Sequence, residues 1–145
     1  MTEEKKIAIV RVRGLVRVKT EINDTLNMLR LYKKNYCTIV PHTQTYLGMI
    51  KKVKDYVTYG EINDETFKML VEKKGQLYKG RETDSKGKIK YTKFFIYNNK
   101  KYKKFFRLNP PKKGFGRKGI KFSFKVRGAL GYRGEKINDL IKRML

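Results

Sequence analysis

Residues 37–61, CTIVPHTQTYLGMIKKVKDYVTYGE, predict a strand, a helix and a second strand joined by very short connections. The first strand is the β-branched run 38–40, and it is followed by a proline, which has no backbone N–H for a sheet. Thr43 is a suitable N-cap for the helix. The apolar residues of this helix recur on one face: Tyr46, Leu47, Ile50 and Val53. Strand-forming residues return at 56–59, and we expect Gly60 to end that strand.

Two further elements precede this unit. Residues 7–12, IAIVRV, are apolar enough for a central strand, and we expect Arg11 and Arg13 to point outward near its end. Residues 21–33 predict a helix, because apolar side chains recur there at helical spacing. The order strand, helix, strand, helix, strand therefore predicts an α+β core: a three-stranded sheet with two helices on one face.

The charge of the chain is strongly asymmetric. The 145 residues carry a formal net charge of +24, which favours a polyanionic partner, with nucleic acid ahead of an acidic membrane surface. Residues 1–72 hold 13 Lys and Arg against 9 Asp and Glu, a net +4, whereas residues 73–145 hold 24 against 4, a net +20. We therefore expect the second half to face the polyanion. No apolar run approaches the roughly 18 residues of a membrane-spanning helix, so we expect a soluble intracellular protein.

Residues 63–109 predict an extension of the core. Asn63 suits the N-cap of a third helix, and Gly75 is expected to end it. A basic aromatic stretch follows and predicts a hairpin that turns at residues 98–99. Aromatic residues interleaved with lysines serve either as core or as a platform on which bases stack, and the sequence leaves both interpretations open.

Residues 110–145 predict a basic, glycine-rich loop that ends in an amphipathic helix over 135–144. Glycine lets a backbone approach phosphates closely, and the neighbouring cations supply charge. We therefore expect RNA contacts from this loop and from the two strand-end arginines. The candidates are Arg11, Arg13, Lys112, Lys113, Arg117, Lys118, Lys121, Arg127, Tyr132 and Arg133.

Enzymatic interpretations find little support in the sequence. His42 is the only histidine and Cys37 the only cysteine, so neither a metal cluster nor a disulfide is expected. Nucleotide-binding glycine motifs and a metalloprotease motif are absent, and no carboxylate pair is set apart as acid and base. We expect no catalytic residue, no cofactor and no small-molecule substrate.

Two stretches of the core, INDTLNMLRL (22–31) and LGMIKKVKDYVTYGEI (47–62), resemble a large-subunit ribosomal protein family. Its bacterial member is protein thirty and its eukaryotic member is protein seven. The tail segments LNPPKKGFG (108–116) and GALGYRGEKINDLIKRM (128–144) resemble the longer archaeal-type version. Residues 76–107 depart from the family pattern, because that pattern has an additional helical segment here and this chain has a basic aromatic stretch instead.

The resemblance implies a ferredoxin-like β-α-β-α-β core and a structural role in the large ribosomal subunit. It implies 23S rRNA as partner, 5S rRNA as a second candidate, neighbouring large-subunit proteins, and a cytoplasmic location. It also implies RNA contacts in the core: Arg30, Lys33, Lys34, His42, Lys51, Lys52 and Lys54.

The sequence thus predicts three segments, namely a core at 1–62, an extension at 63–109 and a basic tail at 110–145. Two other classes compete with the ribosomal interpretation. A non-ribosomal basic RNA-binding protein would share the charge, and an RNA-modifying enzyme would need a catalytic constellation.

Overall fold

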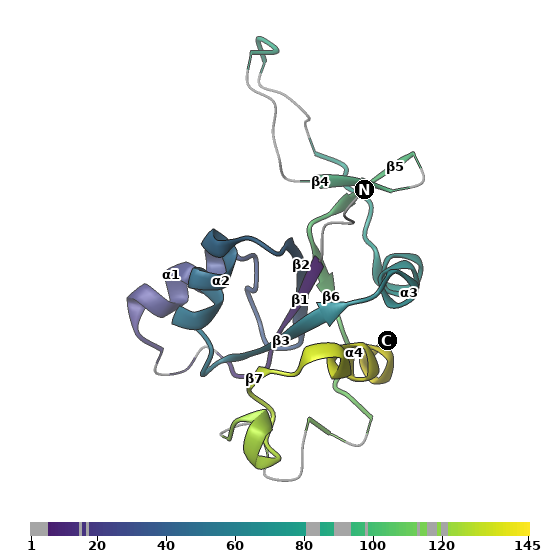
Figure 1. Ribbon diagram of the computed structural model, residues 1–145. Helices are drawn as coiled ribbons and strands as arrows, with labels where there is room; N and C mark the ends of the chain where they lie inside the picture. The colour runs from purple at the N-terminus through teal and green to yellow at the C-terminus, as the bar shows by residue number, and fades with distance from the viewer. Residues whose placement is uncertain are drawn as a thin grey trace.

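The computed structural model of the chain describes residues 6–14, 16, 18–80, 85–88, 94–97, 99–112, 114–115, 119 and 122–145. No helix in these ranges is both long enough and apolar enough to cross a membrane. Figure 1 shows the arrangement of the elements. In chain order they are β1 Lys6–Arg11, α1 Thr20–Met28, β2 Tyr36–Pro41, α2 Gln44–Lys52, β3 Val57–Ile62, α3 Asp64–Lys74, β4 Phe94–Tyr97, β5 Lys100–Lys103, β6 Phe105–Arg107, the 3-10 turn η1 Phe124–Val126, β7 Gly131–Tyr132, the 3-10 turn η2 Gly134–Lys136, and α4 Ile137–Met144.

Five strands form the main sheet, in the order β6-β2-β1-β3-β7. The central strand β1 pairs antiparallel with β2 and β3, and Ile9 lies opposite Thr38 on one side and Tyr59 on the other. The predicted β-α-β-α-β core is therefore confirmed. β6 adds to β2 in antiparallel orientation and β7 adds to β3 in parallel orientation, so the sheet is wider than the predicted three strands. Both added strands come from the basic half of the chain and have only three and two residues, too few for a sequence pattern.

One face of the sheet is covered by α1 and α2, as predicted (Figure 1). Side chains alternate across a strand, and Ile7 and Ile9 of β1 point to this face. The cluster that they form is made entirely of residues between positions 7 and 57: Ile7, Ile9, Leu26, Leu29, Leu31, Val40, Ile50, Val53 and Val57. Local strand and helix periodicity is thus sufficient to build this face.

The opposite face is covered by α3 and α4, where the sequence predicted helices on one face only. Ala8 and Val10 of β1 point to it. The cluster joins residues of all three predicted segments: Ala8, Val10, Cys37, Ile62, Leu70, Val71, Phe106, Leu108, Ile137, Leu140, Ile141 and Met144. The apolar stripe of α4 is fully buried in it, because a helix that is apolar on one side must cover that side.

The predicted caps of α2 and α3 are confirmed, but α1 is shorter than expected. Thr43 Oγ1 accepts a hydrogen bond from Tyr46 N, and Asn63 Oδ1 accepts one from Thr66 N at 2.8 Å. α1 ends at Met28 instead of residue 33, because Arg30 adopts the left-handed conformation at φ 62°. Leu31 N donates to Leu26 O at 2.9 Å, which closes the helix end as a Schellman motif.

Gly60 lies inside β3, where the sequence predicted the end of the strand. It is buried, and it faces the turn η2 that leads into α4. A Cβ at this position would overlap the carbonyl oxygen of Gly134 and the side chain of Ile137. The glycine is therefore needed for close approach between distant segments, which a strand glycine often signals.

The predicted aromatic hairpin is present as β4 and β5, in which Tyr97 lies opposite Lys100 (Figure 1). Asn99 in its turn has φ 63°, whereas Asn98 lies outside the described residues. The rings of the hairpin that the structure describes, Phe95, Tyr97 and Tyr102, pack against the cluster under α3 and α4. The described part of residues 76–107 therefore holds the predicted strands, and it differs from the family pattern, which has a helical segment here.

Candidate nucleic-acid interface

The surface carries far more positive than negative charge. With 37 Lys and Arg and 13 Asp and Glu, at least 24 cations cannot be neutralised by a carboxylate of the chain. Pairing inside the protein does occur, for example between Arg143 Nε and Asp139 Oδ2 at 3.2 Å. The excess cations leave a field that attracts polyanions.

Several predicted RNA contacts gather at one end of the sheet, where β1 ends and β2 and β3 begin. Asn35 N donates to Arg11 O, and both Val12 N and Arg13 N donate to Tyr56 O, so the loops before β2 and β3 both meet the end of β1. The Arg13 guanidinium lies 5.1 Å from the ring centroid of Tyr56. This end of the sheet presents exposed or half-exposed cations: Arg13 after β1, Lys33 and Lys34 before β2, and Lys54 before β3.

Other predicted contacts of the core lie on α2 and beyond the end of β2, and Tyr132 lies on β7. Lys51 and Lys52 are exposed in the last turn of α2, where cations also suit the helix dipole. Tyr132 of β7 is exposed at the sheet edge, with its ring centroid 5.5 Å from that of Tyr59. Burial and the neighbouring Tyr132 raise the pKa of Tyr59. His42 is exposed at the opposite end of the sheet, beyond β2.

Lys112 and Arg127 are exposed in the described parts of the tail, whereas four predicted contacts, Lys113, Arg117, Lys118 and Lys121, lie outside the described residues. Lys112 is attached to the fold through both its backbone N–H and its backbone carbonyl. Its own N–H donates to Arg143 O, and its carbonyl accepts from Arg143 Nη1 at 3.0 Å. Lys112 therefore lies against the end of α4.

Arg11 is buried, so the prediction that it points outward to RNA is wrong. Its side chain shares the α1 and α2 face with Ile9, and it is completely shielded from solvent. Arg11 Nη1 donates to Leu31 O at 2.7 Å and Nε donates to Arg13 O at 2.9 Å. Burial lowers the pKa of this guanidinium. Arg11 thus connects β1 to the segment that follows α1.

Arg133 is also buried, with 6% of its surface exposed, and its guanidinium is engaged inside the protein. Nε donates to Thr58 Oγ1 at 2.8 Å, and Nη2 donates to Phe115 O at 2.7 Å and Ala129 O at 3.0 Å. Burial, together with the nearby Arg143, lowers its pKa to about 10, although Asp139 opposes the shift. The side chain therefore holds the tail on β3, and we remove it from the RNA-contact set.

The structure adds an aromatic and cationic edge at β6 that the sequence did not single out as one surface. Phe105 stacks on Tyr36 with ring centroids 5.5 Å apart and an angle of 5°, and Tyr32 meets Phe105 edge to face at 5.6 Å. Two cations flank these rings, since Arg107 lies 6.0 Å from the Tyr36 centroid and Lys103 lies 5.9 Å from the Phe105 centroid. In the sequence, the only indication of this edge was the alternation of aromatic residues with Lys and Arg. Their grouping depends on strand pairing across about 70 positions of sequence.

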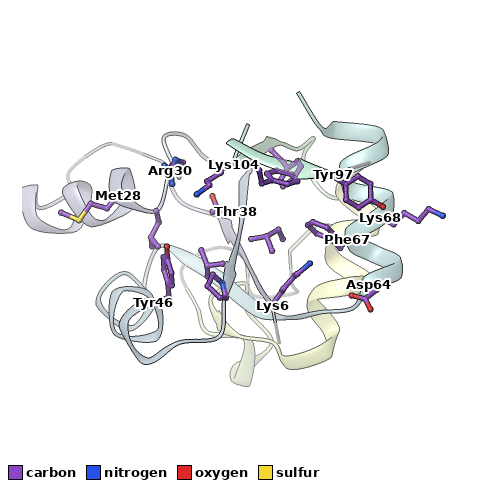
Figure 2. Close-up of a pocket in the computed structure, with 16 residues that line it drawn as sticks. Lys6, Met28, Arg30, Thr38, Tyr46, Asp64, Phe67, Lys68, Tyr97 and Lys104 are labelled. Carbon is purple, nitrogen blue, oxygen red and sulfur yellow. The ribbon is translucent and has the colours of Figure 1, made fainter. Parts of the chain in front are cut away.

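A second feature missed by the sequence is a pocket beside this edge (Figure 2). Its lining includes Arg30 of the predicted set and three cations that were not predicted, Lys6, Lys68 and Lys104. These residues come from four separate parts of the chain, so no local motif could have indicated them. Exposed and half-buried cations beside partly exposed rings can bind phosphates and stack on bases.

The chain matches the family model described as Ribosomal protein L30p/L7e over residues 7–57. It is 44% identical to large ribosomal subunit protein uL30 of Methanococcus maripaludis, over 95% of this chain and 98% of that protein. It is also 44% identical to the uL30 protein of Nanoarchaeum equitans, over 95% of this chain and 97% of that protein. Its identity to the Methanopyrus kandleri uL30 protein is 39%, over 92% of this chain and the whole of that protein. The chain therefore belongs to the ribosomal protein L30p/L7e family, in its archaeal type.

Proposed function

We propose that this chain, as a structural constituent of the large ribosomal subunit, binds 23S rRNA and stabilises its fold, with 5S rRNA as a second partner. One observation carries the proposal. The chain aligns with archaeal large-subunit uL30 proteins over 95% of its length, so the alignment includes the half that carries a net +20. Membership of the ribosome places the protein in the cytoplasm.

The exposed cations suggest how the protein would act on RNA. The sheet and the helices that cover it hold Lys33, Lys34 and Lys54 on loops at one end of the fold, while the basic second half supplies most of the net charge. Lysines bind phosphates without reading bases, so most contacts of the core would go to the RNA backbone and its 2′-hydroxyl groups. In this proposal residues 1–62 dock by shape and residues 110–145 neutralise phosphates between packed rRNA helices.

The proposal includes no catalytic step and no cofactor. The family is a structural one, and the two buried arginines act inside the protein, where they join segments of the fold. Neighbouring large-subunit proteins are the further partners that we propose.

The salt dependence of binding to deproteinised 23S rRNA tests this proposal. Each neutralised phosphate contributes about 0.7–0.9 to the slope of log affinity against log salt, because counterions are released. The double variant Lys51→Gln, Lys52→Gln should reduce the slope by about 1.4–1.8 if both lysines contact phosphates. Glu72→Gln, at an exposed position of α3, is the control and should not lower the slope. An affinity that did not change with salt would contradict the proposal.

A further inference from the structure

A pocket of about 710 Å³ lies along the part of β2 that β6 leaves uncovered. β6 pairs only with residues 36–38, so residues 39–41 of β2 form the floor. One wall is the end of α1 at residues 28–30, and the other wall comes from α3 and the hairpin (Figure 2). The volume is within the range of roughly 300–1,000 Å³ that is typical of small-molecule sites. The space therefore suits an occupant of that size.

One end of the pocket is polar and positively charged. Thr38 has only 3% of its surface exposed, and its Oγ1 has no hydrogen-bond partner among the described residues. Figure 2 shows the side chains of Arg30 and Lys104 at the same end as Thr38. Burial, and then the charge of Arg30, lower the pKa of Lys104. The one carboxylate among the described lining residues is Asp64, which lies at the opposite end beside Phe67 (Figure 2).

The unpartnered hydroxyl of Thr38 and the closeness of Arg30 to Lys104 each cost free energy unless an anion is present. A buried hydroxyl without a partner loses its hydrogen bonds to water, and two cations at close range repel each other. The backbone of Arg30 adds a third cost, because φ 62° at the end of a Schellman motif is a conformation that favours glycine. A bound phosphate would accept a hydrogen bond from Thr38 Oγ1 and offset the repulsion between the two cations.

The other wall of the pocket is aromatic. Phe67 of α3 lies 6.2 Å from Phe95 and 5.8 Å from Tyr97 of the hairpin, measured between ring centroids. Lys6 Nζ lies 4.2 Å from the Phe67 centroid. The three rings are half-buried, so part of their surface is open to the pocket. Such rings with a cation beside them are a typical surface for stacking a nucleobase.

We propose that this pocket holds one unstacked nucleotide of a single-stranded rRNA segment. The base lies against the wall of Phe67, Phe95 and Tyr97, and its phosphate accepts hydrogen bonds from the Thr38 hydroxyl, Arg30 and Lys104. The inference rests on the proposed function, because it takes rRNA as the partner. It adds a defined site at which the protein distinguishes an unpaired nucleotide from the phosphate backbone of a helix.

The test compares two probes of equal charge, an oligouridylate of about twelve nucleotides and an abasic ribose-phosphate chain of the same length. Fluorescence anisotropy gives the affinity of the full chain for each. We expect the wild-type chain to bind the oligouridylate roughly tenfold more tightly, because stacking of a base adds to phosphate contact. Tyr97→Leu keeps an apolar side chain in the strand and should bring this ratio close to one.

Thr38→Val and Arg30→Gly separate binding from folding. Valine has the shape of threonine without the unpartnered hydroxyl, and glycine suits the backbone of residue 30, so neither variant should have a lower melting temperature than the wild type. Both should bind oligouridylate several-fold more weakly. Lys51→Gln removes a charge from α2 outside the pocket lining, and it should preserve the ratio between the two probes.

Wild-type affinity of Thr38→Val, Arg30→Gly and Tyr97→Leu for oligouridylate would overturn the inference. So would loss of the base preference in Lys51→Gln, because the preference would then arise outside the pocket. Competition by an extended acidic peptide could also overturn the inference. If the peptide displaced the oligouridylate equally well from the wild-type chain and from Thr38→Val, addition of a peptide strand to β2 would be favoured. If the wild-type chain bound neither oligomer nor 23S rRNA, the proposed function itself would fail.

Discussion

The two faces of the central sheet are covered in different ways. The buried cluster of the α1 and α2 face consists of residues between positions 7 and 57, and the family model matches the same range. The α3 and α4 face joins residues from Ala8 to Met144. The first face follows from local periodicity, whereas the second depends on close approach between segments that are far apart in sequence. Changes to the second face should therefore affect the attachment of the basic half most strongly.

Removal of α4 should have the largest effect. A chain that ends at Lys136 loses four completely buried apolar side chains, Ile137, Leu140, Ile141 and Met144, each contributing about 1.5–3 kcal/mol. The total of about 6–12 kcal/mol is comparable to the whole free energy of unfolding of an ordinary domain. We expect this shortened chain to lose cooperative unfolding in guanidinium chloride, as measured by circular dichroism. An unchanged transition midpoint would show that the first face is stable alone.

Arg133→Met should have the next largest effect. It leaves the oxygens of Thr58, Phe115 and Ala129 without their donor, at a cost of about 1–3 kcal/mol for each buried group that stays unpaired. Arg127→Met removes the same charge from an exposed side chain and should change the free energy of unfolding by less than about 0.5 kcal/mol. Equal stability of the two variants by denaturant titration would contradict a structural role for Arg133.

The smallest effects in this series concern two glycines. Gly60→Ala introduces a Cβ that overlaps Gly134 and Ile137, and it should destabilise the protein by about 1–3 kcal/mol. Gly48→Ala lies in α2, where the added Cβ has no neighbour within 4 Å outside the backbone of its own helix, and it should stabilise the protein by about 0.5–1 kcal/mol. Thermal unfolding of both variants measures the difference. Similar melting temperatures would mean that α4 does not approach β3 closely.

These contrasts also explain which parts of the fold could be predicted from sequence. The strand before Pro41, the helix capped by Thr43 and the helix capped by Asn63 depend on neighbours within a few positions, and all were predicted correctly. The predicted end of α1 was wrong because Arg30 occupies the left-handed position after the helix. A glycine usually marks this position in a sequence, whereas an arginine does not. Gly60 was misinterpreted for the opposite reason, since its requirement comes from residues more than 70 positions away.

The candidate interface follows the same division. Surface cations such as Lys51 and Lys54 could be identified from the pattern of their helix and loop. Arg11 and Arg133 could not be separated from them, because charge alone does not say whether a guanidinium finds carbonyl partners inside the fold. Lys104 and Thr38 were missed because strand pairing at β6 is what brings them to one pocket.

Cosedimentation tests the central claim most directly. The full chain, made in cells at its normal level, is followed through a sucrose gradient at a salt concentration high enough to remove loosely bound basic proteins. We expect it to remain with the large ribosomal subunit and to be absent from the small subunit. Recovery of the chain at the top of the gradient, free of large subunits, would contradict the account and favour a basic RNA-binding protein that acts outside the ribosome.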